Sequence, residues 1–444
     1  MSARGEFSSR LGFVLAAAGS AVGLGNIWGF PSQVAQNGGA AFVLVYLILA
    51  FFLAYPVLMA ELIIGRATRA NVVDALGAIT QSKAGRYVGL WGALTASLIL
   101  SFYAIVAGWM LAYFVESTLS LVTDKPGLTW FVDFSFSRNW FFCLLFLSFT
   151  AAIVTGGVRQ GIEKWSVRLM PTLVILIVAL IIYVSLQEGA IDGWRAYLIP
   201  DFSKVTDPEL LISAMGQAFF SMSLGVGTML VYGSYIAKSE NLPALGASVA
   251  LVDIGVAVLA GMLIIPAMYV AQANGVAIFT ESGTLIEGDA LIFNVLPSLF
   301  ASIGPIGVVI ASVFFALMSI AAVTSSISML EVPVSYLVED KAVSRTKAVW
   351  VMTLVILGIS TVIIANFGDL FGLVITLTTQ YSQPLLGLIM CVFVGWVWRR
   401  NAILSELKEG FAGAEQSLFW KIWPVYVKFV CPIIIGVMFI RTVL

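Results

Sequence analysis

The sequence contains no histidine, only three cysteines, and few charged residues, which make up 11% of its 444 positions. Without histidine, the chain has no imidazole for a proton relay and lacks the usual ligand of zinc and haem sites. Cys143, Cys391 and Cys431 lie in apolar runs without C-x-x-C spacing, which predicts buried thiols rather than a disulfide framework. Basic segments interleaved with aromatic residues are also missing, so we expect no nucleic-acid partner.

Motifs typical of enzymes are missing as well. The sequence shows no nucleophile–base pair, no metal-binding cluster and no phosphate-binding loop. Its two Gly-x-Gly strings, at Gly23–Gly25 and Gly225–Gly227, do not follow a strand, as a dinucleotide-binding fingerprint requires. We therefore expect a protein that is not an enzyme.

Apolar residues dominate the composition of the chain. Hydrophobic residues make up 60% of the chain, whereas soluble domains contain about 45–50%. This composition predicts an all-α integral membrane protein. One helical crossing of the bilayer needs about 20 apolar residues, and that length predicts eleven transmembrane segments, at 11–36, 40–65, 87–118, 139–156, 163–186, 209–237, 243–271, 304–337, 346–366, 370–398 and 420–442.

The placement of lysine and arginine predicts the orientation in the membrane. Most basic residues fall on one side of the eleven segments, together with the N-terminus, and cytoplasmic loops carry such an excess. We therefore expect a cytoplasmic N-terminus and, because the number of segments is odd, an extracytoplasmic C-terminus. A signal peptide beginning at Arg4 and Arg10 is an alternative interpretation of the N-terminus, but the apolar run continues to Phe30, past any plausible cleavage point.

Two of the segments carry glycine clusters near their centres. The first is "AAAGSAVGLGNIWGFP" at 16–31, and the second is "FFSMSLGVGTMLVYGSY" at 219–235. They lie five segments apart, so the two helices run in opposite directions, as in an inverted repeat with a binding site between its halves. Close packing through small residues is the alternative interpretation. Broken helices would free carbonyl and amide groups, which can bind Na⁺ and a carboxylate.

Four motifs in sequence order resemble the neurotransmitter:sodium symporter family, in its bacterial amino-acid transporter branch. They are "AGSAVGLGNIWGFP", "QNGGAAFVLVYLILAF", "GQAFFSMSLGVGTMLVYGSYI" and "AAVTSSISMLE". The resemblance implies the leucine-transporter-like fold, with eleven transmembrane helices, a 5+5 inverted repeat, and breaks in helices 1 and 6. It divides the chain into a first half at 1–186, a second half at 187–398, and the last helix with its preceding loop at 399–444.

The resemblance also implies a function. We expect a sodium-coupled symporter that imports a neutral, hydrophobic or aromatic L-amino acid by alternating access across a bacterial inner membrane. Its partners would be the amino acid, one or two coupling Na⁺ ions and membrane lipids, without an obligate protein partner. A proton-coupled carrier that uses Asp253 as its proton site, a membrane amino-acid receptor without transport, and a channel remain alternatives.

Two sodium sites are implied residue by residue. The first would use the carbonyl oxygen of Ala21, the substrate carboxylate, and the side chains of Asn26, Ser221 and Asp253. The second would use the carbonyl oxygens of Gly19, Val22 and Ala321 and the hydroxyls of Thr324 and Ser325. Hard oxygen ligands of this kind suit an alkali cation. Hydrogen bonds from the two hydroxyls to their own helix are the alternative interpretation.

Asp253 has a second implied role. A carboxylate within a membrane segment costs about 2.5–3.5 kcal/mol on insertion scales, so it points to a function. In chloride-dependent relatives this neighbourhood is neutral, and chloride supplies the negative charge. Here Asp253 would supply that charge, with Tyr46, Gln217 and Ser221 in the positions that would surround the anion. We therefore expect transport without chloride.

The implied substrate site accepts an amino acid rather than an amine. Relatives that carry monoamines have an aspartate where this chain has Gly23, and the glycine leaves room for a substrate carboxylate near Tyr103. Val226 replaces the phenylalanine of some relatives, which favours a larger or aromatic side chain. The implied substrate-binding residues are Ser20, Ala21, Gly23, Leu24, Gly25, Ile99, Tyr103, Phe220, Ser221, Ser223, Val226, Ser325 and Met329.

The implied gates lie on either side of this site. The inner gate would pair Arg4 with Glu339 or Asp340, over Phe7 and Tyr235. Many relatives have an outer-gate arginine where this chain has Gly29, although Asp369 remains near the position of its acidic partner. The outer gate would therefore depend on Phe220 and Tyr103, assisted by Gln33. Two further buried acids, Glu61 and Glu331, are expected to tie helices together.

Overall fold

The protein is all-helical over the residues that the computed structural model describes, which are 5–121, 135–280, 285–286, 291 and 295–443. Nine helices in this part are long and apolar enough to cross a membrane, and a tenth crossing is a pair of helices bent by 55°. Two shorter helices occupy the predicted sixth segment at 209–237. The expected all-α membrane architecture is confirmed, and the described helices are compatible with eleven crossings.

The helices follow the predicted segments with differences of a few residues at their ends. The elements before residue 200 are α1 (Arg10–Ala21), η1 (Gly25–Gly29), α2 (Phe30–Gln36), α3 (Ala40–Leu49), η2 (Ala50–Ala54), α4 (Tyr55–Thr68), α5 (Val72–Thr80), α6 (Lys83–Ser120), α7 (Phe136–Thr155), η4 (Val158–Glu163), α8 (Lys164–Ser185) and α9 (Ala190–Leu198). The elements after it are η5 (Phe202–Lys204), α10 (Pro208–Ser221), α11 (Thr228–Gly233), α12 (Leu242–Ala273), α14 (Leu296–Ser302), α15 (Pro305–Glu339), α16 (Arg345–Ala365), α17 (Phe367–Ile375), η7 (Thr376–Ser382), α18 (Gln383–Val392), η8 (Phe393–Val397), α19 (Arg400–Gly410), η9 (Ala414–Gln416), α20 (Leu418–Val425), η10 (Tyr426–Val430) and α21 (Cys431–Val443).

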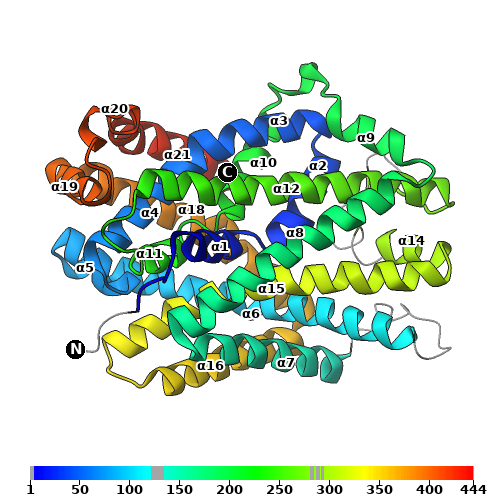
Figure 1. The fold of residues 1–444 in the computed structure, drawn as a ribbon, viewed down its shortest axis with the longest axis horizontal. Helices are drawn as coiled ribbons and strands as arrows, with labels where there is room; N and C mark the ends of the chain where they lie inside the picture. The colour runs from blue at the N-terminus through cyan, green and yellow to red at the C-terminus, as the bar shows by residue number, and fades with distance from the viewer. Residues whose placement is uncertain (1–4, 122–134, 281–284, 287–290, 292–294, 444) are drawn as a thin grey trace.

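Short helices at the centre of the molecule are surrounded by long ones. The long helices α6, α12 and α15 run across the view in Figure 1, and α1 and α11 lie between α12 and α15. α1 packs against α8, α12 and α15, while α11 packs against α4 and α15. Because α1 and α11 end within this bundle, their ends lie among protein groups rather than in lipid.

Both predicted breaks are present. The first separates α1 from η1, and Val22 adopts an extended conformation between them. The second separates α10 from α11, and three of its residues, Ser223, Gly225 and Gly227, have positive φ angles between 51° and 81°. Glycine adopts this left-handed conformation at little cost. At Gly225 a side chain would also collide, since a Cβ there would lie 2.2 Å from the carbonyl oxygen of Gln383.

Buried acidic side chains fix the ends and breaks of the helices. Glu61 of α4 accepts a hydrogen bond of 2.7 Å from the amide of Gly225 in the second break. Glu331 of α15 accepts one of 2.7 Å from the Tyr235 hydroxyl and pairs with Arg345 at 2.6 Å. Both acids therefore join separate helices, as the sequence predicted.

A buried cluster of charges connects α4, α19 and the segment after α11. The Arg66 side chain is 0% exposed, and its Nε donates to Glu406 Oε1 at 2.7 Å. It also donates to the carbonyl oxygen of Glu240 at 2.6 Å, and Lys238 forms a second ion pair with Glu406. A buried charge that loses its partner destabilises a protein strongly. This cluster therefore holds α19 against the end of α4.

Removing the carboxylate of this cluster should destabilise the fold. We expect Glu406→Gln to reduce stability by about 3–5 kcal/mol, because Arg66 would remain buried without an opposite charge. The measurement is the temperature at which purified protein loses its monodisperse chromatography peak. The control is Glu415→Gln, which breaks the exposed Lys408–Glu415 pair and should cost at most about 1 kcal/mol. Equal temperature shifts for both variants would contradict the assigned role.

Candidate functional site

A buried polar cluster lies where η1, α10 and α12 meet. Asp253 of α12 is 0% exposed, and its carboxylate accepts hydrogen bonds from Asn26 Nδ2 at 2.7 Å and from Ser221 Oγ at 2.8 Å. The Tyr46 hydroxyl donates to Ser221 Oγ at 3.4 Å, and the amide of Gly23 donates to Asn26 Oδ1 at 3.1 Å. Three of the residues predicted for the first sodium site thus touch one another across three separate helices.

A second cluster lies where α15 faces the end of α1. Ser325 Oγ donates to the carbonyl oxygen of Val22 at 3.0 Å and to that of Gly19 at 3.4 Å. Thr324 Oγ1 donates to the carbonyl oxygen of Ala321 at 2.9 Å and contacts that of Val22 at 3.4 Å. All five groups predicted for the second sodium site therefore converge. Ser325 therefore bonds to the broken helix. The two shorter bonds of Thr324, to Ala321 at 2.9 Å and to Ile320 at 3.3 Å, stay within α15, as the alternative interpretation expects.

A small cavity of about 40 Å³ separates the two clusters. Twelve of the thirteen predicted substrate-binding residues line it. The exception is Ser20, whose hydroxyl donates to Ser328 at 2.6 Å, although its carbonyl oxygen accepts a hydrogen bond of 3.2 Å from Ser223 beside the cavity. One further lining residue, Gln383 of α18, was not predicted. The described lining residues carry no charged side chain.

Beyond this cavity lies a larger vestibule of about 540 Å³. Leu24, Gly25, Tyr103, Phe220 and Gln383 line both spaces and therefore form the boundary between them. The amide of Leu24 donates to the Tyr103 hydroxyl at 3.3 Å, which draws α6 toward the first break. Phe220 lies directly over Gly25, because a Cβ at Gly25 would come within 2.8 Å of its ring.

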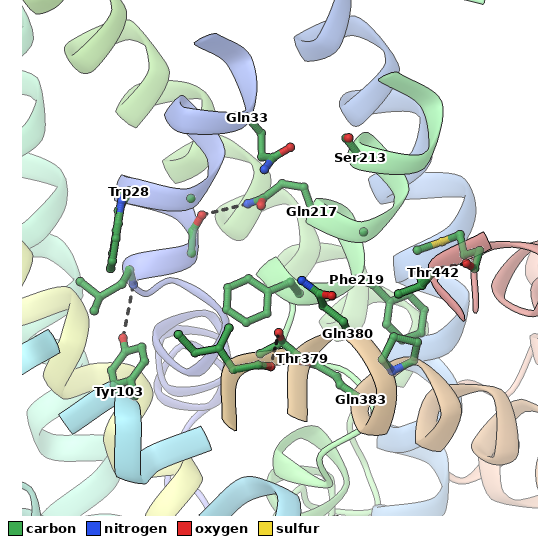
Figure 2. A pocket seen from close by; sticks show the side chains of 18 of the residues that line it. Trp28, Gln33, Tyr103, Ser213, Gln217, Phe219, Thr379, Gln380, Gln383 and Thr442 are labelled. Carbon is green, nitrogen blue, oxygen red and sulfur yellow. Dashed lines mark hydrogen bonds between the residues drawn. The ribbon is translucent and has the colours of Figure 1, made fainter. Parts of the chain in front are cut away.

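Glutamines supply much of the polarity of this vestibule. Figure 2 shows Gln33 and Gln217 on one side and Gln380 and Gln383 on the other. Gln217 Nε2 donates to the carbonyl oxygen of Gly25 at 2.8 Å, so it pairs a carbonyl group beside the first break. The described residues that line the vestibule include no charged side chain.

The role of Asp369 in an outer gate stays a prediction. Asp369 lies exposed in the first turn of α17 and does not line the vestibule. Ile375 lines it instead, together with Thr379 in the following η7 segment. Asp369 comes six residues before Ile375, which places it nearly two helical turns further along α17. Gln33, which was also predicted for the outer gate, does line the vestibule.

Aromatic and charged contacts hold the N-terminal segment against the residues around the end of α11 and against η4. The Phe7 ring packs edge-on against Tyr235 and Tyr232, with centroids 6.3 and 5.8 Å away. Its amide donates to the carbonyl oxygen of Tyr235 at 3.1 Å. Glu163 then fixes the start of α1, because its carboxylate accepts hydrogen bonds of 2.8 Å from the amide and 2.7 Å from the hydroxyl of Ser8.

The predicted ionic part of the inner gate is described only in part, because Arg4 lies outside the described residues. Glu339 accepts a hydrogen bond of 2.8 Å from the amide of Asn71. Asp340 pairs with Arg86 and Lys341, each at 2.8 Å. Hydrogen bonds from Lys341 and Arg86 lower the pKa of Asp340 to about 2. Asp340 therefore has two cationic partners among the described residues.

One family profile matches almost the whole chain. The profile of the Sodium:neurotransmitter symporter family matches residues 4–133 and 132–444. The chain belongs to this family. The predicted family is thus confirmed, and the protein is a sodium-dependent, multi-pass membrane transporter and not an enzyme.

Similar family members come from distant organisms. The chain is 31% identical to the sodium-dependent transporter YhdH of Bacillus subtilis, over 99% of this chain and 97% of that protein. It is 34% identical to a sodium-dependent transporter of Haemophilus influenzae, over 98% of both chains. The crystal structure of MhsT in complex with L-phenylalanine has a TM-score of 0.86 and 36% identity, and it covers 99% of this chain and 100% of that one.

Proposed function

We propose that this protein imports a neutral L-amino acid, hydrophobic or aromatic, by sodium-coupled symport that does not require chloride. The convergence of five oxygen groups from α1 and α15 supports this proposal most directly. Gly19, Val22 and Ala321 supply carbonyl oxygens there, and Thr324 and Ser325 supply hydroxyls within 3.4 Å of them. Oxygen ligands without sulfur or imidazole fit Na⁺.

The first cluster supports a second Na⁺ and the independence from chloride. Asn26, Ser221 and the Ala21 carbonyl group would bind this ion beside the carboxylate of Asp253. Because Asp253 is buried and hydrogen-bonded to Asn26 and Ser221, it supplies a fixed negative charge within the site. A fixed carboxylate makes a chloride ion unnecessary for charge balance.

The cavity between the clusters supports a neutral amino acid as substrate. The amides of Leu24 and Gly25 and the Tyr103 hydroxyl would hold its carboxylate. The described side chains that line the cavity are uncharged, so an acidic or basic substrate would find no partner for its side chain. The related protein MhsT, which was crystallised with L-phenylalanine, supports an aromatic substrate.

Alternating access would use the closures on the two sides of this cavity. Tyr103 and Phe220, with Gln33 beyond them, would close it toward the vestibule. Phe7 and Tyr235 would close it on the cytoplasmic side, where the N-terminus is expected. The membrane potential adds about 2.3 kcal/mol per charge for each 100 mV, so two ions would drive steep accumulation of substrate.

Uptake of L-phenylalanine into proteoliposomes tests this proposal. We expect accumulation under an inward Na⁺ gradient, loss of accumulation when K⁺ replaces Na⁺ at constant pH, and full accumulation when gluconate replaces chloride. Accumulation driven by a proton gradient in K⁺ would instead indicate a proton-coupled carrier. Sodium-dependent binding without accumulation would indicate a receptor, and loss of uptake in gluconate would contradict the role of Asp253.

A further inference from the structure

Gln383 occupies an unusual position at the boundary between the two cavities. It is the first residue of α18, its side chain is only 3% exposed, and it lines both the substrate cavity and the vestibule. Its Oε1 atom is buried and has no hydrogen-bond partner. A buried carbonyl oxygen without a partner is unfavourable, so a ligand that donates a hydrogen bond to it gains affinity.

The other polar side chains around the substrate cavity are already engaged. Ser221 donates to Asp253, Ser223 donates to the carbonyl oxygen of Ser20, and Ser325 donates to that of Val22. Among the described residues lining this cavity, Gln383 is the one whose buried side chain has an unpaired polar atom.

The backbone contacts of Gln383 place it beside the second helix break. A Cβ at Gly225 would lie 2.2 Å from the Gln383 carbonyl oxygen, and Val226, the next residue, lines the same cavity. The neighbouring walls at Ile99 and Met329 are apolar. Groups that could hold a substrate carboxylate, at Leu24 and Gly25, belong to the first break instead. Gln383 therefore lies where the second break meets the boundary between the two cavities, and a substrate whose carboxylate binds at the first break would extend its side chain toward the second break and this residue.

We propose that Gln383 selects among substrates by accepting a hydrogen bond from the substrate side chain. The preferred substrate is then a neutral aromatic amino acid whose ring carries an O–H or N–H donor, since the apolar walls would bind the ring and the amide oxygen would bind the donor. This inference rests on the proposed amino-acid transport.

The matched pair L-tyrosine and L-phenylalanine tests it, because the two differ by one hydroxyl donor. The measurement is the equilibrium dissociation constant of each, in Na⁺, for the purified full-length protein. We expect tyrosine to bind about tenfold more tightly than phenylalanine. Gln383→Leu should weaken tyrosine binding more than phenylalanine binding and so remove this preference. Gln380→Leu, which changes a vestibule residue that does not line the substrate cavity, should keep it.

The outcomes separate this inference from the proposed function. Equal binding of both amino acids by the native protein, or equal weakening of both in Gln383→Leu, would overturn the role of Gln383 and leave sodium-dependent amino-acid binding intact. If no amino acid binds in Na⁺, the proposed function is wrong, and this inference falls with it. Retained phenylalanine binding also shows that the variant is folded. If Gln383→Leu cannot be purified, Gln383→Met serves, since it keeps the length of the side chain.

Discussion

Asp253→Asn should reduce sodium-dependent uptake by at least about 100-fold, because removing a charge from a buried charged site costs on the order of 3–5 kcal/mol. The carboxylate is 0% exposed and joins Asn26 and Ser221, two groups that would bind the same ion. Asparagine keeps the size of the side chain and one of its acceptors, so the main change is the charge. The measurement is initial uptake as a function of Na⁺ concentration, with choline maintaining the ionic strength.

The matched control is Asp369→Asn. This side chain lies exposed at the start of α17, outside the vestibule, and the same substitution there should leave uptake unchanged. The half-saturating Na⁺ concentration should rise in Asp253→Asn and stay constant in the control. Native sodium dependence in Asp253→Asn would exclude Asp253 from the ion site. A defect in Asp369→Asn would support the predicted role of Asp369 in the outer gate.

The helix breaks could be predicted from the sequence because their cause is local. Gly225 and Gly227 adopt left-handed conformations that other residues adopt at a cost, so the glycine cluster itself indicates an interruption. Polar neighbours favour a binding site over close packing alone, and two of them, Asn26 and Ser221, are joined by a hydrogen bond of 2.9 Å. The residues of the cavity lining, in contrast, were implied by the family resemblance, since four of them, Ile99, Tyr103, Ser325 and Met329, lie on α6 and α15, away from the breaks.

The predictions on the tenth predicted segment were poorer because the facing side of that helix depends on its winding. The η7 segment, Thr376–Ser382, has π-helical hydrogen bonds, and such bonds span one residue more than those of an α-helix. A helical period of 3.6 residues therefore does not identify which side chains face the vestibule on either side of η7. Gln383, the first residue after η7, was missed for this reason.

Ser20 illustrates a different limit of prediction from sequence. The family resemblance placed Ser20 in the substrate site, but its hydroxyl donates to Ser328 on α15. The direction of a short polar side chain is set by the partner that tertiary packing brings near it. The sequence alone does not show which partner will lie within hydrogen-bond distance. Its carbonyl group, whose direction follows from the break itself, does accept a hydrogen bond beside the cavity.

A single methyl group at Gly23 should weaken substrate binding strongly. The Cβ of Gly23→Ala would lie 2.4 Å from Ser325 Oγ and 2.9 Å from the Tyr103 hydroxyl, so both groups would have to move. Ser325 contributes to the second cluster, and Tyr103 lines the cavity where the substrate carboxylate would lie. Overpacking of this kind costs about 1–3 kcal/mol, and the methyl group also takes up cavity space. We expect the affinity for L-phenylalanine in Na⁺ to fall by about 100-fold or more.

Gly29→Ala is the matched control in the same broken segment. A Cβ at Gly29 would meet its nearest atom, Oε1 of Gln217, at 3.5 Å, which is an ordinary contact. Neither glycine has a positive φ angle, so alanine strains the backbone at neither position and the two variants differ in the space available. Native affinity in Gly23→Ala would show that the substrate binds elsewhere. Equal losses of affinity in both variants would show that the segment tolerates no added side chain, whatever faces it. A loss of affinity confined to Gly23→Ala would place the substrate between the two breaks.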